Sequence, residues 1–157
     1  MDRTDASFLT SYLPYLLRQA DQTLSAPFYA RLTHHGVARS EWRVLAVLHE
    51  TGDLCVADLA DAALSPQPTV THALRRLEQR HLVVRTPGTD DRRQRFVSIT
   101  PAGARLTSGL LAEARELEAE ALADAGDLSA LVSQLRDLTA AVDAGVRRRA
   151  EQTARAG

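Results

Sequence analysis

The fold is decided by residues 64–101, LSPQPTVTHALRRLEQRHLVVRTPGTDDRRQRFVSITP. Near its start, apolar side chains at i, i+4 and i+7 (Val70, Leu74 and Leu77) predict an amphipathic helix with one buried stripe. Two apolar runs follow, at 82–85 and 95–99, and a loop rich in glycine, aspartate and arginine separates them. We therefore expect a helix followed by a β-hairpin whose tip carries arginines.

The expected helix leaves a polar and cationic face outside its apolar stripe. That face holds Pro68, Thr69, Thr71, His72, Arg75 and Arg76. Hydroxyl, imidazole and guanidinium groups on an exposed helix are suited to the major groove of double-stranded DNA. Arg92 and Arg93, at the expected hairpin tip, would then lie over the flanking backbone or minor groove. The segment therefore predicts a DNA-binding surface.

The distribution of charge supports this prediction better than the total charge does. The whole chain has 19 basic and 20 acidic residues and a formal net charge of −1. Residues 65–95 hold seven arginines and three acids, a local net charge of +4, so the remainder carries −5. A basic patch on an acidic body is typical of a phosphate-binding surface. The alternative, a solvated charged face, does not explain why the arginines gather on a helix and a hairpin.

Composition limits the classes of protein that need to be considered. A chain of 157 residues with 45% apolar and 25% charged residues suits either one ordinary globular domain or a small domain plus an oligomerisation element. No run has the roughly 18 apolar residues of a membrane span, and no signal-peptide core is present, so we expect a cytoplasmic protein without a membrane partner. The single cysteine and the absence of zinc-ligand spacing predict neither metal nor cofactor. Because phosphate-loop and nucleophile motifs are also missing, an enzyme is not expected.

Helical patterns dominate the chain before the deciding segment. Residues 7–34 predict an amphipathic helix that Pro27 should kink or divide and that Gly36 should end. Ser40 is the predicted N-cap of a short helix over 41–50, and another short helix is expected over 56–63. A short helix, a tight turn and the polar-faced helix form a helix-turn-helix, and the hairpin adds a wing.

The chain after the hairpin predicts two further amphipathic helices. Thr100 and Pro101 should start one that runs to Asp124, and Gly126-Asp127 should separate it from the next. In that last helix the apolar spacing is about 3.5 residues. The positions that follow this spacing are Leu128, Leu131, Leu135, Leu138, Val142 and either Gly145 or Val146. These helices have more apolar surface than a winged domain can cover, which favours a homodimer over a monomer that folds them back on itself.

The predicted fold is therefore mainly α-helical with a small β-hairpin wing. It divides into an N-terminal dimerisation helix (1–36), a winged helix-turn-helix DNA-binding domain (37–100) and C-terminal dimerisation helices (101–157).

Over nearly its whole length the sequence resembles the MarR family of bacterial transcription regulators. The resemblance rests on Tyr12-Leu-Pro-Tyr-Leu-Leu, Glu41-Trp-Arg-Val-Leu, Val56-Ala-Asp-Leu-Ala, Asp91-Arg-Arg and Val97-Ser-Ile-Thr-Pro-Ala-Gly103. It implies a homodimer, usually a repressor, that binds a pseudo-palindromic operator and is often released by a small aromatic or carboxylic ligand or by an oxidant. It also implies that Arg93 enters the minor groove while Asp91 braces the wing tip.

Roles can be assigned to the polar face on this basis. Pro68, Thr69 and His72 are the candidates for contact with base edges, since they lie near the start of the helix. Thr69 and Thr71 could also donate to phosphates, and Arg75 and Arg76 are expected to contact phosphates. In a symmetric dimer the two helices should reach major grooves about 34 Å apart.

An effector pocket is implied between the first, second and fifth helices. Its predicted lining is Tyr12, Tyr15, Trp42 and Arg43, which offer aromatic walls and a guanidinium for a planar carboxylate. Each has an ordinary structural alternative: the tyrosines in a dimer interface, the tryptophan in the core and the arginine in a surface ion pair. His34 and His35 could join the pocket or satisfy carbonyls at a helix end.

Two other modes of action remain open. Cys55 lies near a predicted helix N-terminus, where a thiolate is favoured, and it could make the protein a redox-sensing regulator. The peroxide sensors of the family have their reactive cysteine in the first helix, where this chain has none, so a structural role for Cys55 is favoured. A non-specific architectural DNA-binding protein, or a winged helix used for protein contacts, is the other alternative; architectural binding would be sensitive to salt but not to sequence.

Overall fold

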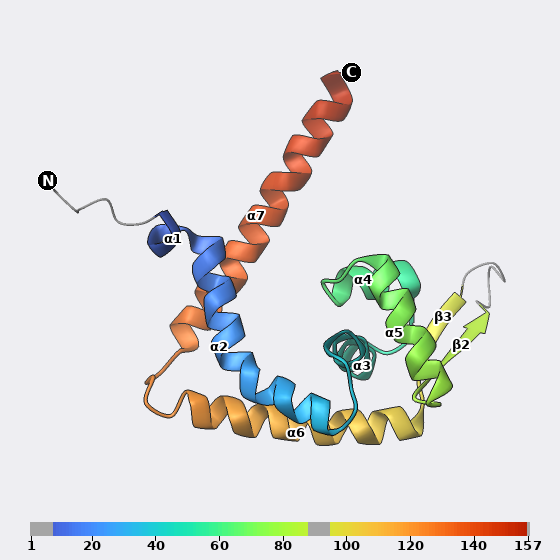
Figure 1. The fold of residues 1–157 in the computed structure, drawn as a ribbon. Helices are drawn as coiled ribbons and strands as arrows, with labels where there is room; N and C mark the ends of the chain where they lie inside the picture. Colours follow the sequence, from blue (N-terminus) through green and yellow to red (C-terminus); the bar gives the residue numbers. More distant parts are fainter. Residues whose placement is uncertain (1–7, 88–94, 157) are drawn as a thin grey trace, which may run out of the picture. The chain divides into compact units, whose positions relative to one another are not determined.

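Helices dominate residues 8–87 and 95–156, the part of the chain that the computed structural model describes (Figure 1). The elements are α1 (Phe8–Ser11), α2 (Leu13–His34), α3 (Arg39–Thr51), β1 (Leu54–Cys55), α4 (Val56–Ala62), α5 (Gln67–Gln79), β2 (Val83–Pro87), β3 (Arg95–Ile99), α6 (Pro101–Ala121) and α7 (Ser129–Ala156). The predicted fold class, mainly α with a small β wing, is confirmed. Within these ranges no helix is both long and apolar enough to cross a membrane.

The chain forms two compact units, Met1–Ala121 and Leu122–Gly157. The first contains every helix and strand up to α6, and the second contains α7. The functional division at residues 36 and 100 stays a prediction.

The first long helix differs from the expectation in where it breaks. The interruption falls at Tyr12, between α1 and α2, and Pro27 lies inside α2. The expected division at Pro27 is therefore wrong, although α2 does bend along its length (Figure 1). A proline removes only one backbone donor, and the buried side chains of Phe28 and Leu32 hold the following turn in place. Gly36 ends the helix as predicted, with φ of +63°.

Helix α3 begins two residues earlier than expected and has a different cap. Ala38, not Ser40, occupies the N-cap position, and its own side chain cannot accept a hydrogen bond. Instead Oε2 of Glu41 accepts a 2.8 Å hydrogen bond from the backbone N–H of Ala38. The predicted Ser40 cap is wrong. The helix begins at Arg39, and the side chain of Glu41, at the third helical position, binds the backbone N–H of the N-cap residue.

The wing is a three-stranded antiparallel sheet of order β1-β3-β2. Strands β2 and β3 pair from Val83 opposite Ile99 to Pro87 opposite Arg95, as the hairpin prediction required. Strand β1, which was not predicted, adds Leu54 opposite Val97. The hairpin tip, with Asp91, Arg92 and Arg93, falls outside the described residues.

The core of the first unit fixes α5 by burying one of its faces. Val70, Leu74 and Leu77 are at most 1% exposed, and the predicted stripe is confirmed. They pack with side chains of α3, α4 and the sheet. Complete burial of such a side chain stabilises a fold by about 2 kcal/mol. A second cluster joins α2 to α6 through Phe28 and Leu110.

Helix α6 starts as the sequence predicts. Pro101 is its first residue, and the hydroxyl of Thr100 accepts a 3.1 Å hydrogen bond from the N–H of Gly103. The same hydroxyl lies 2.8 Å from the carbonyl oxygen of His81, to which it donates. This threonine therefore connects the start of α6 to the turn that precedes β2.

In the second unit, Gly126 has φ of +70°, and Asp127 accepts hydrogen bonds from Ser129, the first residue of α7. One carboxylate oxygen of Asp127 accepts from the N–H of Ser129 at 2.9 Å and the other from its hydroxyl at 3.0 Å. These hydrogen bonds, the backbone one first, lower the pKa of the Asp127 carboxyl. Several apolar side chains of α7 lie on its surface: Leu131, Val132, Leu138, Val142 and Val146.

Candidate nucleic-acid interface

The start of α5 offers few backbone donors. Pro66 is its N-cap residue and Pro68 lies in its first turn, and neither has an N–H group. The side chain of Pro66 makes no capping hydrogen bond either. An anion at the start of α5 would therefore depend mainly on side chains, and the contribution expected from the helix N-terminus is small.

The exposed side of α5 gathers four of the predicted DNA-binding residues around an open hollow of about 510 Å³. The hollow is lined by Gln67, Pro68, Thr71, His72 and Arg75. Thr69 is exposed but does not line it. Gln67 was missed by the sequence analysis, although it precedes Thr71 by four residues and an amide can bind adenine through two hydrogen bonds.

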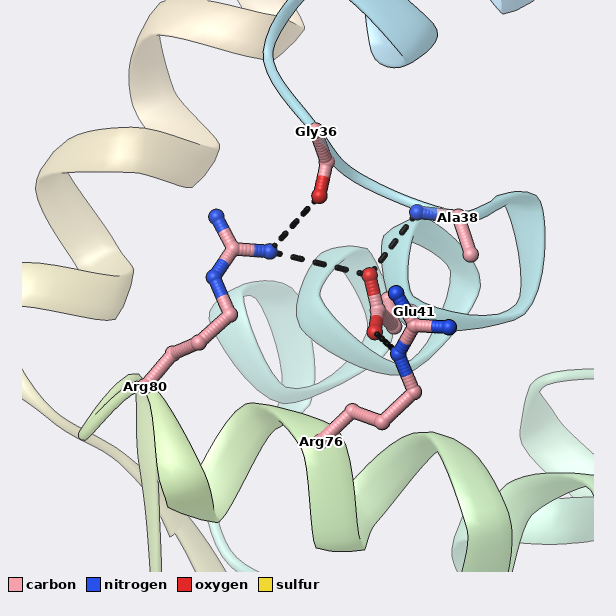
Figure 2. A network of polar contacts seen from close by, with 5 residues as sticks. All are labelled: Gly36, Ala38, Glu41, Arg76 and Arg80. Atoms are coloured by element: carbon pink, nitrogen blue, oxygen red, sulfur yellow. Dashed lines mark hydrogen bonds and ion pairs between the residues drawn. The ribbon is translucent and has the colours of Figure 1, made fainter.

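Arg76 and Arg80 are directed back at the protein (Figure 2). Arg75, in contrast, lines the open hollow. Nε of Arg76 lies 2.7 Å from Oε1 of Glu41, and Nη1 of Arg80 lies 3.7 Å from Oε2. Arg80 also donates a 2.9 Å hydrogen bond to the carbonyl oxygen of Gly36. The Arg76 contact is an ion pair and not a well-directed hydrogen bond, because Oε1 has no hydrogen-bond partner within residues 8–87 and 95–156.

A third arginine of the basic segment also has an internal partner. Nε of Arg85 on β2 lies 3.0 Å from Oε1 of Glu78 on α5, and both side chains are about one third exposed or less. The pair therefore connects the wing to the helix. Of the described arginines in residues 65–95, Arg75 and Arg95 take part in no ion pair with the described chain. The local charge of +4 thus overstates the cations available to phosphate, because Glu41, outside that segment, was not counted.

A cavity of about 330 Å³ lies between α2, α3 and α6, the three helices expected to form the effector pocket. Its lining includes Phe28, Trp42, Arg115 and Glu118. The rings of Phe28 and Trp42 meet edge to face with centroids 4.9 Å apart. Arg115 and Glu118 were missed by the sequence analysis, since only the packing of α6 on α2 identifies which of its charged residues border this space.

The other predicted lining residues lie elsewhere. Tyr12 and Tyr15 are 43% and 41% exposed and do not line the cavity. Arg43 borders a separate cavity of about 340 Å³ and donates to Ser65 Oγ at 3.5 Å. His35 pairs with Glu113 of α6, Nε2 to Oε1, at 2.8 Å, which favours its structural interpretation.

Cys55 has local contacts that account for its position. It is the N-cap of α4, where its sulfur accepts from the N–H of Asp58 at 3.5 Å and its thiol donates to Oδ2 of Asp58 at 3.1 Å. These contacts favour the structural interpretation of this residue over redox sensing. Across residues 8–87 and 95–156, no group of three or more His, Cys, Asp or Glu side chains is arranged to hold a metal ion.

Comparison with known proteins identifies the chain. The family model described as MarR family matches residues 37–94. The transcriptional regulator FarR of Neisseria gonorrhoeae is 34% identical over 90 residues, which are 57% of this chain and 62% of FarR. The chain thus spans less than two thirds of the length of this relative.

Two solved structures match over most of their length. A MarR family regulator from Silicibacter pomeroyi DSS-3 has 31% sequence identity and a TM-score of 0.72, over 85% of this chain and 98% of that one. NadR in complex with 4-hydroxyphenylacetate has 30% identity and a TM-score of 0.73, over 84% of this chain and 92% of that one. Sequence, fold and the exposed polar helix agree, and the chain belongs to the MarR family of transcription regulators.

Proposed function

We propose that this protein is a homodimeric repressor that binds a pseudo-palindromic DNA operator through α5 and the wing. The observation that carries the proposal is the contrast between the two sides of α5. One side is buried at Val70, Leu74 and Leu77, and the other presents polar groups around an open hollow. A helix held by its apolar stripe while its polar side faces solvent is ready to enter a major groove.

The residues of this face divide by chemistry into base-reading and phosphate-binding groups. Gln67 and His72 can exchange hydrogen bonds with base edges, and Pro68 offers an apolar surface to a thymine methyl group. Thr69, Thr71 and Arg75 are suited to phosphates. Arg92 and Arg93 are proposed, from the sequence alone, to contact the flanking backbone and minor groove.

Exposed apolar side chains at both ends of the chain support the proposal of a dimer. In α1 and α2 they are Phe8, Leu9, Tyr12, Leu13, Tyr15, Leu16, Leu17 and Leu24, each at least 38% exposed. In α7 they are Leu131, Val132, Leu138, Val142 and Val146. Apolar surface of this extent is typical of an interface, and a second copy of the chain would bury it.

A hydroxylated aromatic acid is the proposed effector. The rings of Phe28 and Trp42 would contact a planar ligand, Arg115 would pair with its carboxylate, and the carboxylate of Glu118 would accept from a hydroxyl group. NadR, a similar protein, was solved with 4-hydroxyphenylacetate, which has both groups. This lining replaces Tyr12, Tyr15 and Arg43, and only Trp42 is kept from the sequence prediction.

The DNA-binding proposal is tested by selecting duplexes from a random 30-base-pair library with the purified protein. We expect an inverted repeat whose half-sites are about one helical turn apart. The selected duplex should then compete for the protein far better than random DNA, and Arg93→Ala should weaken its binding about tenfold without lowering stability. Enrichment of no sequence would instead identify an architectural DNA-binding protein.

The effector proposal is tested with 4-hydroxyphenylacetate, using the fluorescence of Trp42, the only tryptophan of the chain. A saturable change is expected, and Arg115→Ala should weaken it while the exposed Arg105→Ala should not. The same ligand should release the selected duplex. No saturable change in Trp42 fluorescence would remove this class of ligand from the cavity.

A further inference from the structure

Glu41 is a buried carboxylate that joins three segments of the first unit (Figure 2). It lies on α3 and is 0% exposed, yet it contacts Arg76 of α5, Arg80 at the end of α5 and the N–H of Ala38. We propose that Glu41 is a positioning residue for DNA recognition: without touching DNA, it sets the orientation of α5 and so the preference for one operator. The inference rests on the DNA-binding role proposed for α5.

The burial of Glu41 shows that these contacts are required. A carboxylate withdrawn from water destabilises the fold unless cations and donors compensate for the lost hydration. Here two guanidinium groups and one backbone N–H do so. A neutral glutamine of the same shape could not attract both arginines. The charge of Glu41 therefore holds the C-terminal half of α5 in place.

The apolar stripe of α5 cannot supply this orientation alone. Packing of Val70, Leu74 and Leu77 keeps the helix on the core, but apolar contact is non-directional and tolerates small rotations. Arg76 follows His72 by four residues, one helical turn, and Arg75 by one. Fixing the guanidinium of Arg76 to an atom of α3 therefore fixes the angle at which these two neighbours face DNA. Base readout requires donors to be placed to about 0.5 Å.

Arg80 extends the same connection to the end of α2. It follows the last residue of α5 and donates to the carbonyl oxygen of Gly36, the glycine that terminates α2. Glu41 in turn binds the N–H of Ala38. The turn at 36–38 and the end of α5 thus both contact the carboxylate of Glu41. The end of α5 is therefore held against main-chain atoms of that turn, whose positions do not depend on side-chain rotamers.

The test varies Glu41 and not Arg76, because Arg76 is 53% exposed and could itself reach a phosphate. For Glu41→Gln, affinity is measured for the duplex selected by the wild-type protein and for a random duplex of equal length. The ratio of the two affinities should fall about tenfold or more, the effect of disturbing one or two base contacts. Affinity for the random duplex should stay the same or rise, since two arginines lose their carboxylate partner.

Glu50→Gln is the matched control. It removes the same charge from the same helix, but Glu50 is exposed and has no ion pair among the described residues. Its affinity ratio should equal that of the wild type. Because both duplexes are measured on one preparation, a partly unfolded sample lowers both affinities and leaves the ratio unchanged, which separates positioning from stability.

Arg80→Met covers the case in which Glu41→Gln does not fold. It removes one partner of Glu41 and the hydrogen bond to the carbonyl oxygen of Gly36 but leaves Arg76 in place. Its ratio should fall in the same direction by a smaller factor. Wild-type ratios in the folded variants, with only the melting temperature lowered, would overturn the inference. A wild-type protein that prefers no duplex would instead reject the DNA-reading role of α5, and the inference with it.

Discussion

Gly103, in the first turn of α6, lies directly against the carbonyl oxygen of Leu82, the residue before β2. A side chain at position 103 would overlap that oxygen, and its Cβ would also lie 2.9 Å from Cγ1 of Ile99. Helix α6 can therefore approach the base of the wing only because this position has no side chain. The geometry of the approach leads to a prediction about stability.

Gly103→Ala should lower the free energy of unfolding by about 2 kcal/mol, because the backbone of β2 or α6 must move to admit the methyl group. Gly109→Ala, in the same helix, meets nothing within 4 Å and should raise it, by up to about 1 kcal/mol, through better helix propensity. Urea unfolding of both variants measures the difference. Equal effects at the two positions would contradict the close approach.

Substitution of the two adjacent arginines of α5 should change different properties: the salt dependence of DNA binding for Arg75 and the stability of the fold for Arg76. Arg75→Ala should leave stability unchanged but lower the slope of log affinity against log salt by about one, as expected for one lost phosphate contact. Arg76→Ala should lower the free energy of unfolding by about 1–3 kcal/mol, because buried Glu41 loses a cation. Urea unfolding and a salt series with the selected duplex distinguish them. If Arg75→Ala proved the less stable, the assignment of these two residues would be reversed.

Assembly should depend on the apolar side of α7. Leu138→Glu places a charge among exposed apolar residues that we propose are covered by a second copy, so light scattering after size exclusion should report a single subunit. Ser133→Glu adds the same charge to the opposite side of the helix and should leave the dimer intact. An unchanged mass for Leu138→Glu would show that this side of α7 is not the interface.

Acid should weaken the start of α7. Its lowered pKa means that Asp127 stabilises this helix end when ionised, and this stabilisation is lost as the pH falls through the lowered pKa. A carbon-detected NMR titration should place the pKa of Asp127 below its ordinary value. Ser129→Ala should raise it only partway, since the backbone hydrogen bond from residue 129 remains. Full return to the ordinary value would assign the shift to the hydroxyl alone.

The sequence predicted an element correctly wherever the residues of that element alone showed a periodic pattern or a start signal. Val70, Leu74 and Leu77 repeat with the period of a helix, and Thr100-Pro101 is a local start signal, so the structure confirms both. Strand β1 was missed because its two residues pair with β3, far along the chain, and have no periodicity of their own. Of the two outcomes expected at Pro27, a kink or a division, the structure excludes the division, because tertiary packing holds a helix that local chemistry disfavours.

The exposed residues of the candidate site could be predicted from the sequence, but the ion-pair partners of its arginines could not. His72 and Arg75 lie off an apolar stripe, which the sequence shows directly. Arg76 and Arg80 look alike in sequence, and only the approach of α3 reveals that Glu41 neutralises them. Similarly, Arg115 borders the cavity only because α6 packs against α2 and α3.

Glu41 and Trp42 are consecutive, yet they belong to different surroundings. Glu41 forms ion pairs with the end of α5, and Trp42 lines the cavity between α2, α3 and α6. A shift of this single helical turn would change both the ion pairs to α5 and the shape of the cavity. Occupancy of the cavity and occupancy of DNA would then be thermodynamically linked, and each would change the dissociation constant of the other by the same factor.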